Sequence, residues 1–362
     1  MAGVTVEHLR KTCGSVVAVD DISFEDSINA LFATLPGEFV DRLYEELPPD
    51  LAERALRGMR ASRPITFRVN SLRVTDPTAI DAELAAAGVE TAPVPWYRWG
   101  RLVSTPGVHE GYLARLPAYQ EGRLYLQSLS SMLPPLVLQP QPGERVLDLA
   151  AAPGSKTTQM AAMMENRGTI LACEINPIRA GRLRHNLQVQ GVSIATVMEA
   201  DGAQVARQPE HVGAFDRVLV DAPCSGEGLF SYGQAETYRH WSPRLVHRLA
   251  ETQRKLLAAG WQALRSGGRL VYSTCTLSLA ENEEVIAWAL RKFGGQAQVE
   301  PAVLPEGQEL TTAIADALPG LGLQEAPGRN PPFVSAQLSR TVRILPSNLM
   351  EGFFLAVLHK QA

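Results

Sequence analysis

The sequence predicts an α/β fold, in which a doubly wound, mostly parallel sheet follows a small N-terminal α+β module. From Glu144 onward, short apolar runs alternate with helical patterns, and this alternation is typical of a parallel sheet with helices on both faces. Two further apolar runs, 341–345 and 352–359, are close enough in sequence to form an antiparallel pair that closes the sheet. Before Glu144 the pattern differs, because residues 65–72 alternate apolar and polar side chains as a half-buried strand does.

These patterns divide the chain into a helical segment at 1–62, the α+β module at 63–122 and a main domain at 123–362. In the helical segment, apolar residues recur at helical spacing from 26 to about 60, with a break at Pro48 and Pro49. In the module, a helix at 77–87 and short strand-like pieces follow the first strand.

The main domain is expected to hold a seven-stranded sheet. Its five parallel strands are expected at 145–150, 168–174, 195–201, 215–221 and 268–273, and the terminal pair completes the seven. Helices are expected at 125–135, from Lys156, and at 177–190, 246–264 and 281–292. Residues 294–338 are rich in Pro, Gly and Gln, and we expect them to form a long surface connection.

Composition and charge exclude several classes of protein. The chain of 362 residues is 45% hydrophobic and 20% charged, which is ordinary for a globular protein. Its four cysteines are unevenly spaced and no Cys/His cluster has zinc spacing, so we expect neither a disulfide framework nor a metal site. No run approaches the ~18 to 20 apolar residues that cross a bilayer, and the N-terminus lacks the apolar core of a signal peptide. We therefore expect a cytoplasmic monomer with free thiols and no membrane partner.

Two cysteines stand directly after expected strands. Cys224 follows the strand at 215–221, and Cys275 follows the strand at 268–273. If these strands are parallel neighbours, both thiols lie at the C-terminal edge, where open α/β sheets bind ligands. With Asp221 three residues before Cys224, the pair suggests covalent chemistry on an electrophilic carbon. Cys13 and Cys173 are interpreted as structural.

The first four strands each end in or near an acid, which suggests a nucleoside site. These acids are Asp148, Glu174, Asp201 and Asp221. Glu174 stands at the end of the second strand, where a ribose is gripped through its hydroxyls. The loop after the first strand is small and tight, and it consists of Ala150, Ala151, Ala152, Pro153, Gly154, Ser155 and Lys156. It matches neither a phosphate loop nor GxGxxG, so an adenosine ligand without a pyrophosphate, such as S-adenosylmethionine, fits better.

Three segments in order now carry a family resemblance: VLDLAAAPGSKT at 146–157, DAPCSG at 221–226 and STCT at 273–276. They resemble the signature segments of the Nol1/Nop2/Sun (RsmB/RsmF-like) family of S-adenosylmethionine-dependent RNA cytosine-5 methyltransferases. The resemblance implies a class I methyltransferase fold, which is Rossmann-like. It also implies that residues 150–156 wrap the methionine part of the cofactor, that Glu174 takes the ribose hydroxyls and that Asp201 takes the adenine amino group. Arg179 falls where some members have another cofactor contact, although an arginine on a helix face is the alternative.

Methylation of a pyrimidine carbon explains why two thiols are needed. Carbon 5 of cytosine is a poor nucleophile until a thiolate adds to carbon 6 and a donor at N3 stabilises the charge that develops. Amino-group methylases have an aromatic residue in the turn that here ends in Cys224, so the turn favours carbon methylation. The chemistry alone allows either Cys224 or Cys275 to attack carbon 6. The resemblance implies that Cys275 is the nucleophile, that Cys224 assists product release, that Asp221 contacts N3 and that Lys156 organises the site.

The expected partner is RNA, with small-subunit ribosomal RNA favoured and transfer RNA as the alternative. The net charge of −4 provides no general basic field, so a local patch must hold the phosphates. Residues 66–73 resemble the RNA-contacting segment of the family, which makes the module at 63–122 an RNA-binding module. Trp241 and Arg244 are candidates for base stacking and phosphate contact, or for helix packing and a solvated face. A catalytically silent RNA-binding assembly factor is the alternative from another class, and residues 1–60 could dock on RNA or on the catalytic domain.

Overall fold

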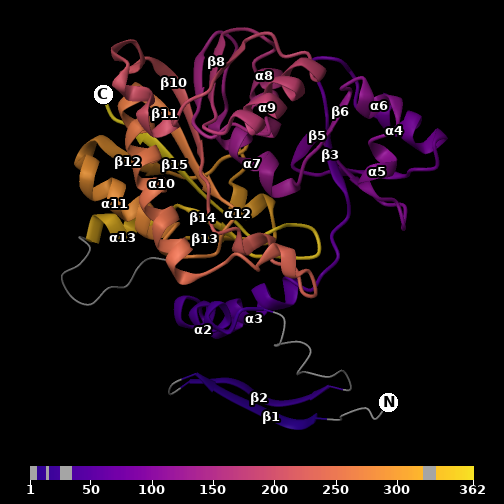
Figure 1. Ribbon diagram of the computed structural model, residues 1–362, viewed down its shortest axis with the longest axis vertical. Coiled ribbons are helices and arrows are strands. Elements are labelled where there is room, and N and C mark those ends of the chain that lie inside the picture. The colour runs from indigo at the N-terminus through magenta and orange to yellow at the C-terminus, as the bar shows by residue number, and fades with distance from the viewer. Residues whose placement is uncertain (1–5, 14–15, 25–34, 321–331) are drawn as a thin grey trace.

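The computed structural model describes residues 6–13, 16–24, 35–320 and 332–362. Its centre is a nine-stranded mixed sheet, with a separate four-stranded sheet beside it (Figure 1). Along the central strand β10 (Phe215–Asp221), successive side chains enter different cores. Val218 and Val220 pack in the cluster that includes α10 and α11, whereas Leu219 packs in the cluster that includes α7 and α8. Helices therefore cover both faces, as expected for a doubly wound sheet.

The strand order of the large sheet is β13-β14-β15-β11-β10-β7-β8-β9, and β12 also pairs with β15. The parallel strands are β7 (Arg145–Asp148), β8 (Thr169–Cys173), β9 (Ala195–Met198), β10 and β11 (Leu264–Thr274). The antiparallel ones are β12 (Ala297–Glu300), β13 (Ala317–Pro319), β14 (Val342–Ile344) and β15 (Phe353–Lys360). All seven expected strands are present, and β14 and β15 form the expected antiparallel pair.

Two edge strands correct the expectation for residues 294–338. This region contains β12 and β13, so the sheet has nine strands rather than seven. Each has only three or four residues, too few for a distinct strand signal, and β13 ends in Pro319. They pair with β15 and β14, whose exposed edges supply the backbone partners.

The helices of the main domain lie mainly where the patterns place them. They are α7 (Leu129–Leu138), α8 (Ser155–Met163), α9 (Pro177–Val189), α10 (Pro243–Ala263), α11 (Glu283–Phe293), α12 (Leu310–Ala313) and α13 (Pro332–Leu338). The last two fall in the region that was expected to be a connection. Among the described residues, none of the helices has the length and apolar character needed to span a membrane.

The four-stranded sheet belongs to the small module. Its order is β4-β5-β3-β6, with β3 (Thr66–Val69), β4 (Thr91–Val94), β5 (Tyr97–Val103) and β6 (Leu124–Leu126). Short helices α4 (Thr78–Ala86), α5 (Glu110–Leu113) and α6 (Pro117–Gln120) complete it. Because β6 pairs with β3, the module sheet extends past the expected boundary at residue 122. Arg68 on β3 is fully buried and donates to Thr158 Oγ1 of α8 at 2.9 Å, which fastens the module to the main domain.

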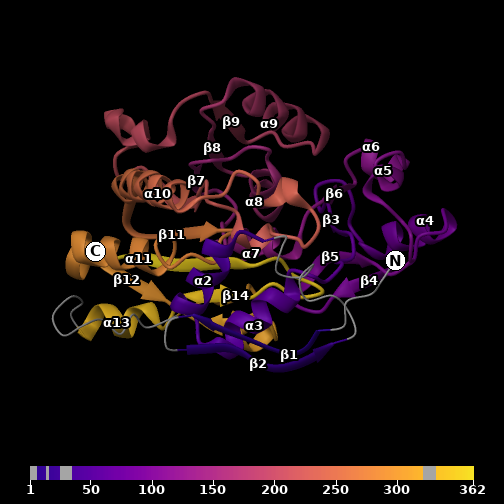
Figure 2. The ribbon, with the colours of Figure 1, turned by 60° about the horizontal axis from the view of Figure 1, so that its bottom comes forward.

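The N-terminal region is only partly helical. Helices α2 (Gly37–Glu46) and α3 (Pro49–Gly58) flank the expected break at Pro48, whereas residues 26–34 of the expected helix lie outside the described part. Strands β1 (Val6–Cys13) and β2 (Val16–Phe24) form an antiparallel hairpin, which corrects the expectation of a helical segment over 1–62. Figure 2 shows α2 and α3 in front of the main domain, and apolar side chains of both helices share a core with Phe230 and Leu277 of that domain.

Candidate active site

The structure brings Cys224 and Cys275 together. Strands β10 and β11 are parallel neighbours in which Asp221 lies opposite Ser273, so the loops that follow them leave the same edge of the sheet. The two sulfur atoms are 3.2 Å apart. The hydrogen bond with Cys275, reinforced by burial, raises the pKa of the Cys224 thiol well above its usual value. Cys173 lies elsewhere, buried within β8, where burial raises its pKa to about 12.

Asp221 and Lys156 form an ion pair beside the thiols. Lys156 Nζ lies 2.7 Å from Asp221 Oδ2, and Ser273 Oγ donates to Asp221 Oδ1 at 2.7 Å. Lys156 Nζ also donates to Ser131 Oγ of α7 at 2.9 Å. Burial lowers the pKa of Lys156, but the charge of Asp221, aided by the nearby Cys275 sulfur, offsets this and raises the pKa overall. The site therefore presents an oriented carboxylate and a fixed ammonium next to the Cys275 sulfur.

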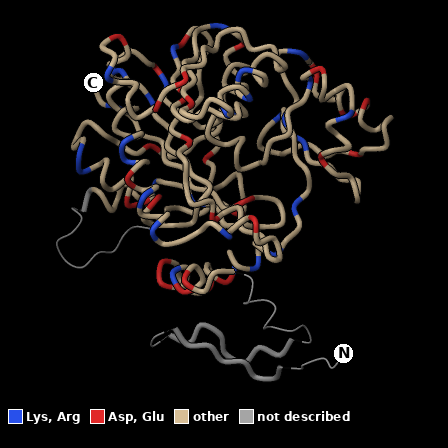
Figure 3. The backbone as a smooth tube through the Cα atoms, viewed as in Figure 1, with Lys and Arg blue, Asp and Glu red and all other residues tan. Residues whose placement is uncertain are grey.

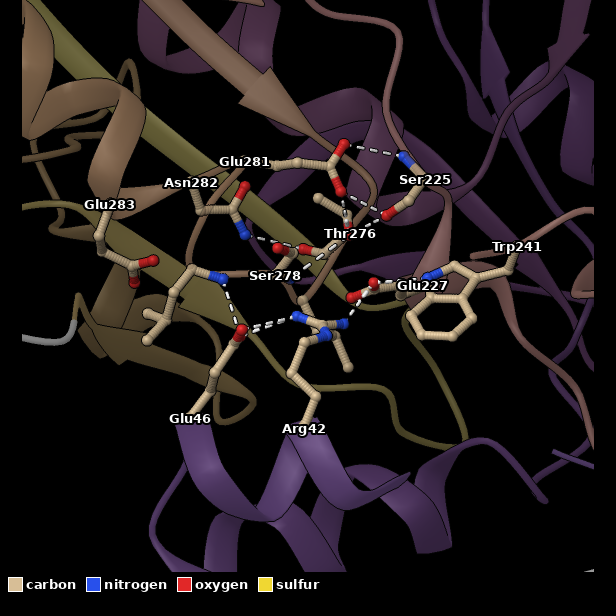
Figure 4. Close-up of polar contacts among 12 residues, drawn as sticks. Arg42, Glu46, Ser225, Glu227, Trp241, Thr276, Ser278, Glu281, Asn282 and Glu283 are labelled. Carbon is tan, nitrogen blue, oxygen red and sulfur yellow. Dashed lines mark hydrogen bonds and ion pairs between the residues drawn. The ribbon is translucent and has the colours of Figure 1, made fainter. Parts of the chain in front are cut away.

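Glu281 links the two cysteine-bearing loops, a role that the sequence did not reveal. Ser225 donates to Glu281 through its backbone N at 2.9 Å and through Oγ at 2.5 Å, and Thr276 Oγ1 lies 3.3 Å from the same carboxylate (Figure 4). Gln253 of α10 donates to it at 2.9 Å. Burial raises the pKa of Glu281 to about 7. The only sequence signal was the acid-rich run ENEE at 281–284 after Cys275.

The expected cofactor loop, residues 150–156, joins β7 to α8. Ala151 and Ala152 are buried, and Gly154 precedes the helix with φ +108, a conformation that favours glycine. A side chain at Gly154 would also meet Leu183 Cδ1 at 2.9 Å. The loop therefore packs closely against α9.

Asp148 presents an unused acceptor beside this loop. It is buried at the end of β7, where Thr157 Oγ1 donates to its Oδ2 at 2.7 Å, while its Oδ1 has no hydrogen-bond partner. Burial raises its pKa to about 7. A free acceptor beside a small-residue loop fits a ligand that carries an amino group, as the methionine part of S-adenosylmethionine does.

Glu174, Arg179 and Asp201 lie at the same edge of the sheet. Glu174 follows β8 and is nearly buried, and its Oε1 accepts from the backbone N of Asn176 at 2.9 Å. Arg179 Nη1 lies 3.5 Å from Glu174 Oε2, while its Nη2 donates to Ala152 O at 2.7 Å. Arg179 is therefore attached to the cofactor loop and is not simply an arginine on a solvated helix face. Asp201 follows β9 and accepts from the backbone N of Ala203 at 2.9 Å.

The structure bears on two expectations for RNA contact, those for Trp241 and for residues 66–73. Trp241 is only 9% exposed, and its Nε1 donates to Glu227 Oε1 at 2.8 Å, so it packs in the protein and offers no stacking surface. In the segment 66–73, Arg68 and Asn70 are buried between module and main domain. Arg244 is exposed near the start of α10 and is still available to a phosphate.

Among the described residues, no group of three or more His, Cys, Asp or Glu side chains is arranged to hold a metal ion.

Comparisons with known proteins agree with this architecture. Residues 135–359 match the family model of the 16S rRNA methyltransferase RsmB/F. The chain is 38% identical over 307 residues to ribosomal RNA small subunit methyltransferase F of Klebsiella pneumoniae (strain 342), covering 83% of this chain and 58% of that protein. It is 40% identical over 273 residues to tRNA (cytosine(49)-C(5))-methyltransferase of Pyrococcus abyssi, covering 75% of this chain and 80% of that protein.

A solved structure shows the same fold. The structure of a methyltransferase homolog protein from Pyrococcus horikoshii superposes with a TM-score of 0.74 at 28% identity, covering 92% of this chain and 98% of that one. The chain spans little more than half the length of the Klebsiella relative. The match to the family model and the identity to the Pyrococcus abyssi protein show that the chain belongs to the RsmB/F methyltransferase family, whose fold is the class I, Rossmann-like one.

Proposed function

We propose that this protein is an RNA cytosine-5 methyltransferase that uses S-adenosylmethionine and forms a covalent bond between Cys275 and carbon 6 of a cytidine. The observation that carries the proposal is the pair of sulfur atoms 3.2 Å apart beside the Lys156–Asp221 ion pair. Attack on a pyrimidine and later removal of its carbon 5 proton require two groups that reach the same ring, and two adjacent thiols meet this requirement.

The charges around the thiols favour Cys275 as the nucleophile. The Lys156 ammonium interacts with the Cys275 sulfur, so the positive charge of the site lies beside this sulfur. At Cys224 the thiol form is favoured instead, because the hydrogen bond with Cys275, burial and the negative charge of Glu281 all raise its pKa. This difference supports attack by Cys275 and argues against the alternative in which Cys224 attacks.

The remaining groups of the site stabilise charge on the cytosine ring and transfer protons. Asp221, held by Lys156 and Ser273, contacts N3 and the exocyclic amine of the cytosine and shares a proton with N3, so that this proton and the Lys156 ammonium neutralise the charge that forms when Cys275 adds to carbon 6. When bound, S-adenosylmethionine supplies the methyl group from its sulfonium. Cys224 releases its own proton to solvent once Cys275 has left the hydrogen bond, takes the carbon 5 proton and becomes a thiol again, while the ring electrons expel Cys275 as a thiolate. The hydrogen bond between the thiols is broken while Cys275 is bound to carbon 6, which removes the largest cause of the raised pKa of Cys224.

The cofactor would be held at the ends of β7, β8 and β9. Residues 150–156 and the free Oδ1 of Asp148 would surround its methionine part. Glu174 would accept hydrogen bonds from the ribose hydroxyls, and Asp201 would accept from the adenine amino group. Arg179 would border the site, since it pairs with Glu174 and donates to Ala152 O. Carboxylates that accept hydroxyl and amino hydrogens suit a ligand with a ribose and a purine but no pyrophosphate.

Small-subunit ribosomal RNA is the substrate that we propose, because the family model that matches the main domain is described for 16S rRNA. Transfer RNA is the alternative, supported by the tRNA methyltransferase of Pyrococcus abyssi at 40% identity. The proposal includes a monomer that acts in the cytoplasm, where its thiols stay reduced. Exposed Arg244 is a candidate phosphate contact.

Mass spectrometry of nucleosides tests this proposal. Ribosomal and transfer RNA are incubated with labelled S-adenosylmethionine and the wild type, Cys275→Ala or Cys224→Ala. We expect label in 5-methylcytidine with the wild type, none with Cys275→Ala, and a trapped protein–RNA adduct with Cys224→Ala. Activity that survives Cys275→Ala would mean that the other thiol attacks. No label in either RNA would favour a binding protein that does not transfer methyl groups.

A further inference from the structure

Helix α2 contacts both loops that carry the thiols. We call residues 222–242, which follow β10, the Cys224 loop, and residues 275–282, which follow β11, the Cys275 loop. Figure 4 shows Arg42 and Glu46 pointing from α2 toward these loops. Helix α2 precedes the segment that the family model matches, which begins at residue 135.

Arg42 connects α2 with the Cys224 loop. Its guanidinium forms an ion pair with Glu227, which is fully buried three residues after Cys224. The same carboxylate accepts from Trp241 Nε1 at 2.8 Å, so Glu227 ties both ends of the Cys224 loop to α2. Burial lowers the pKa of Arg42, but the charges of Glu227 and Glu46 offset this and raise it overall. The guanidinium therefore stays charged.

Glu46 connects α2 with the Cys275 loop. Its Oε2 accepts from the backbone N of Leu279 at 2.9 Å, and its carboxylate accepts from Arg42 Nη1 at 2.8 and 2.9 Å. Arg42 thus holds two carboxylates, one bonded to each side of the site. A planar guanidinium with several donors suits this bridging role better than an ammonium does.

The Cys224 loop and the Cys275 loop also contact each other directly, through a backbone hydrogen bond next to Glu227. The backbone N of Gly228, next to Glu227, donates to Cys275 O at 2.9 Å. A side chain at Gly228 would lie 2.0 Å from Gly352 O, so the backbone of the Cys224 loop packs tightly here against the residue that precedes β15. A shift of Glu227 would therefore move the backbone that holds Cys275.

The outward face of α2 is unsuited to RNA. Its exposed charged residues are all acidic, namely Glu38, Asp41 and Glu45. Figure 3 draws acidic positions in red, and they gather on this helix. Such a face repels phosphates, and Arg42 is turned inward toward Glu227. The polar contacts of α2 are thus directed at the catalytic loops.

We propose that Arg42 and Glu46 are positioning residues, which hold the Cys224 loop and the Cys275 loop in the arrangement that keeps the two thiols in contact. Neither side chain touches the reacting atoms. They act through Glu227 and Leu279, so α2 completes a site whose chemistry is supplied by the main domain. The catalytic part of this inference rests on the proposed function, whereas the placement of the thiols does not.

The test compares Arg42→Met, Arg42→Lys and Glu46→Gln with Arg57→Met as a matched control. Arg57 also lies on an N-terminal helix and pairs with a glutamate four residues away, at 3.4 Å, but it is 69% exposed and its ion pair stays within α3. Two measurements are made on each full-length protein. The first is the rate at which hydrogen peroxide joins Cys224 to Cys275 in the absence of RNA, and the second is kcat and KM for RNA methylation together with the Kd of S-adenosylmethionine.

We expect Arg42→Met to slow disulfide formation and to lower kcat, each about tenfold or more, because a small displacement of reacting groups is costly. The Kd of S-adenosylmethionine should not change, since Arg42 and Glu46 bond to the Cys224 loop and the Cys275 loop and not to the cofactor loop at 150–156. Arg42→Lys should recover part of both rates, Glu46→Gln should lower both less than Arg42→Met does, and Arg57→Met should match the wild type.

Other results would contradict the inference. Wild-type rates for Arg42→Met would show that α2 does not position the thiols. If all three variants lost cofactor affinity in parallel with kcat, α2 would stabilise the fold as a whole and would not act on the thiol-bearing loops in particular. If the wild type methylates no RNA, the proposed function fails, but the disulfide rates still test whether Arg42 and Glu46 place the thiols.

Discussion

The sulfur atoms of Cys224 and Cys275 lie 3.2 Å apart, although the residues are 51 positions apart in the chain. The parallel register of β10 and β11 brings their loops to one point, and the hydrogen bonds of Glu281 to Ser225 and Thr276 keep the loops together. A pair of thiols at this distance is suited to proton exchange with one substrate ring. It is also open to oxidation.

Hydrogen peroxide is expected to join Cys224 to Cys275 and to abolish activity reversibly. Each thiol loses one hydrogen, the peroxide is reduced to two waters, and dithiothreitol restores both thiols. Peptide mass spectrometry identifies the bridge. Cys173 serves as an internal control, because it is buried and its pKa is raised to about 12. Inactivation with both thiols separately oxidised, and no bridge, would contradict this prediction.

The stability of the protein is expected to rise as the pH falls from 8 to about 5.5. Burial raises the pKa of Glu281 from 4.5 to about 7, so the native state binds a proton that the unfolded chain lacks between these values. As the pH rises through the range between these two pKa values, deprotonation of Glu281 alone lowers the free energy of unfolding by roughly 3 kcal/mol. Asp148, raised from 3.8 to about 7, contributes with the same sign.

Glu281→Gln identifies the source of this pH dependence. The amide keeps one acceptor for Ser225 but has no charge to bury, so part of the pH dependence should disappear. Thermal unfolding measured at both pH values gives the comparison. A wild type that is no more stable at pH 5.5 than at 8, or a variant with an unchanged pH dependence, would argue against a buried, proton-binding Glu281.

Much of the site was predictable because its signals are local. Cys224 and Cys275 stand at the ends of apolar runs, and parallel neighbours must bring such ends to one edge of a sheet. The bridge from α2 has no such signal. Arg42 is 185 residues from Glu227, and Glu46 is 233 residues from Leu279, so no spacing in the sequence links them.

The corrections have a similar cause. The aromatic and basic residues around Trp241 allowed either an RNA surface or helix packing, because a pattern along one element does not say which other element covers it. Here Phe39 of α2 packs edge-on against Trp241, with ring centroids 5.8 Å apart. Likewise, β12 and β13 are strands only because β15 and β14 offer edges to them.

Lys156→Met is expected to slow methyl transfer roughly 100-fold, a typical cost of losing a group that stabilises charge in a transition state. The variant removes the ammonium from Asp221 and from the Cys275 sulfur, while Ser273 still orients the carboxylate. Initial rates under saturating cofactor measure the effect. Because the pKa of Lys156 is raised above 10.5, the wild type should keep this ion pair as the pH rises to that value. A variant with the wild-type rate would exclude Lys156 from the chemistry.

Glu174→Gln is expected to weaken binding of S-adenosylmethionine on the order of 10- to 100-fold, the range for a hydrogen bond that loses its charge. The amide can still accept from the backbone N of Asn176, so the turn after β8 should persist. Its lost charge no longer attracts Arg179, which remains bonded to Ala152 O. Titration calorimetry with the cofactor measures the change.

Glu165→Gln is the matched control for that measurement. Glu165 lies in the same cofactor half, after α8, but it is 67% exposed and pairs with Arg167 at 2.6 Å. It should bind the cofactor as the wild type does. If Glu165→Gln weakened binding as much as Glu174→Gln, the effect would come from overall charge. If neither did, Glu174 would be a buried strand-end acid whose role is limited to the turn at Asn176 and the ion pair with Arg179.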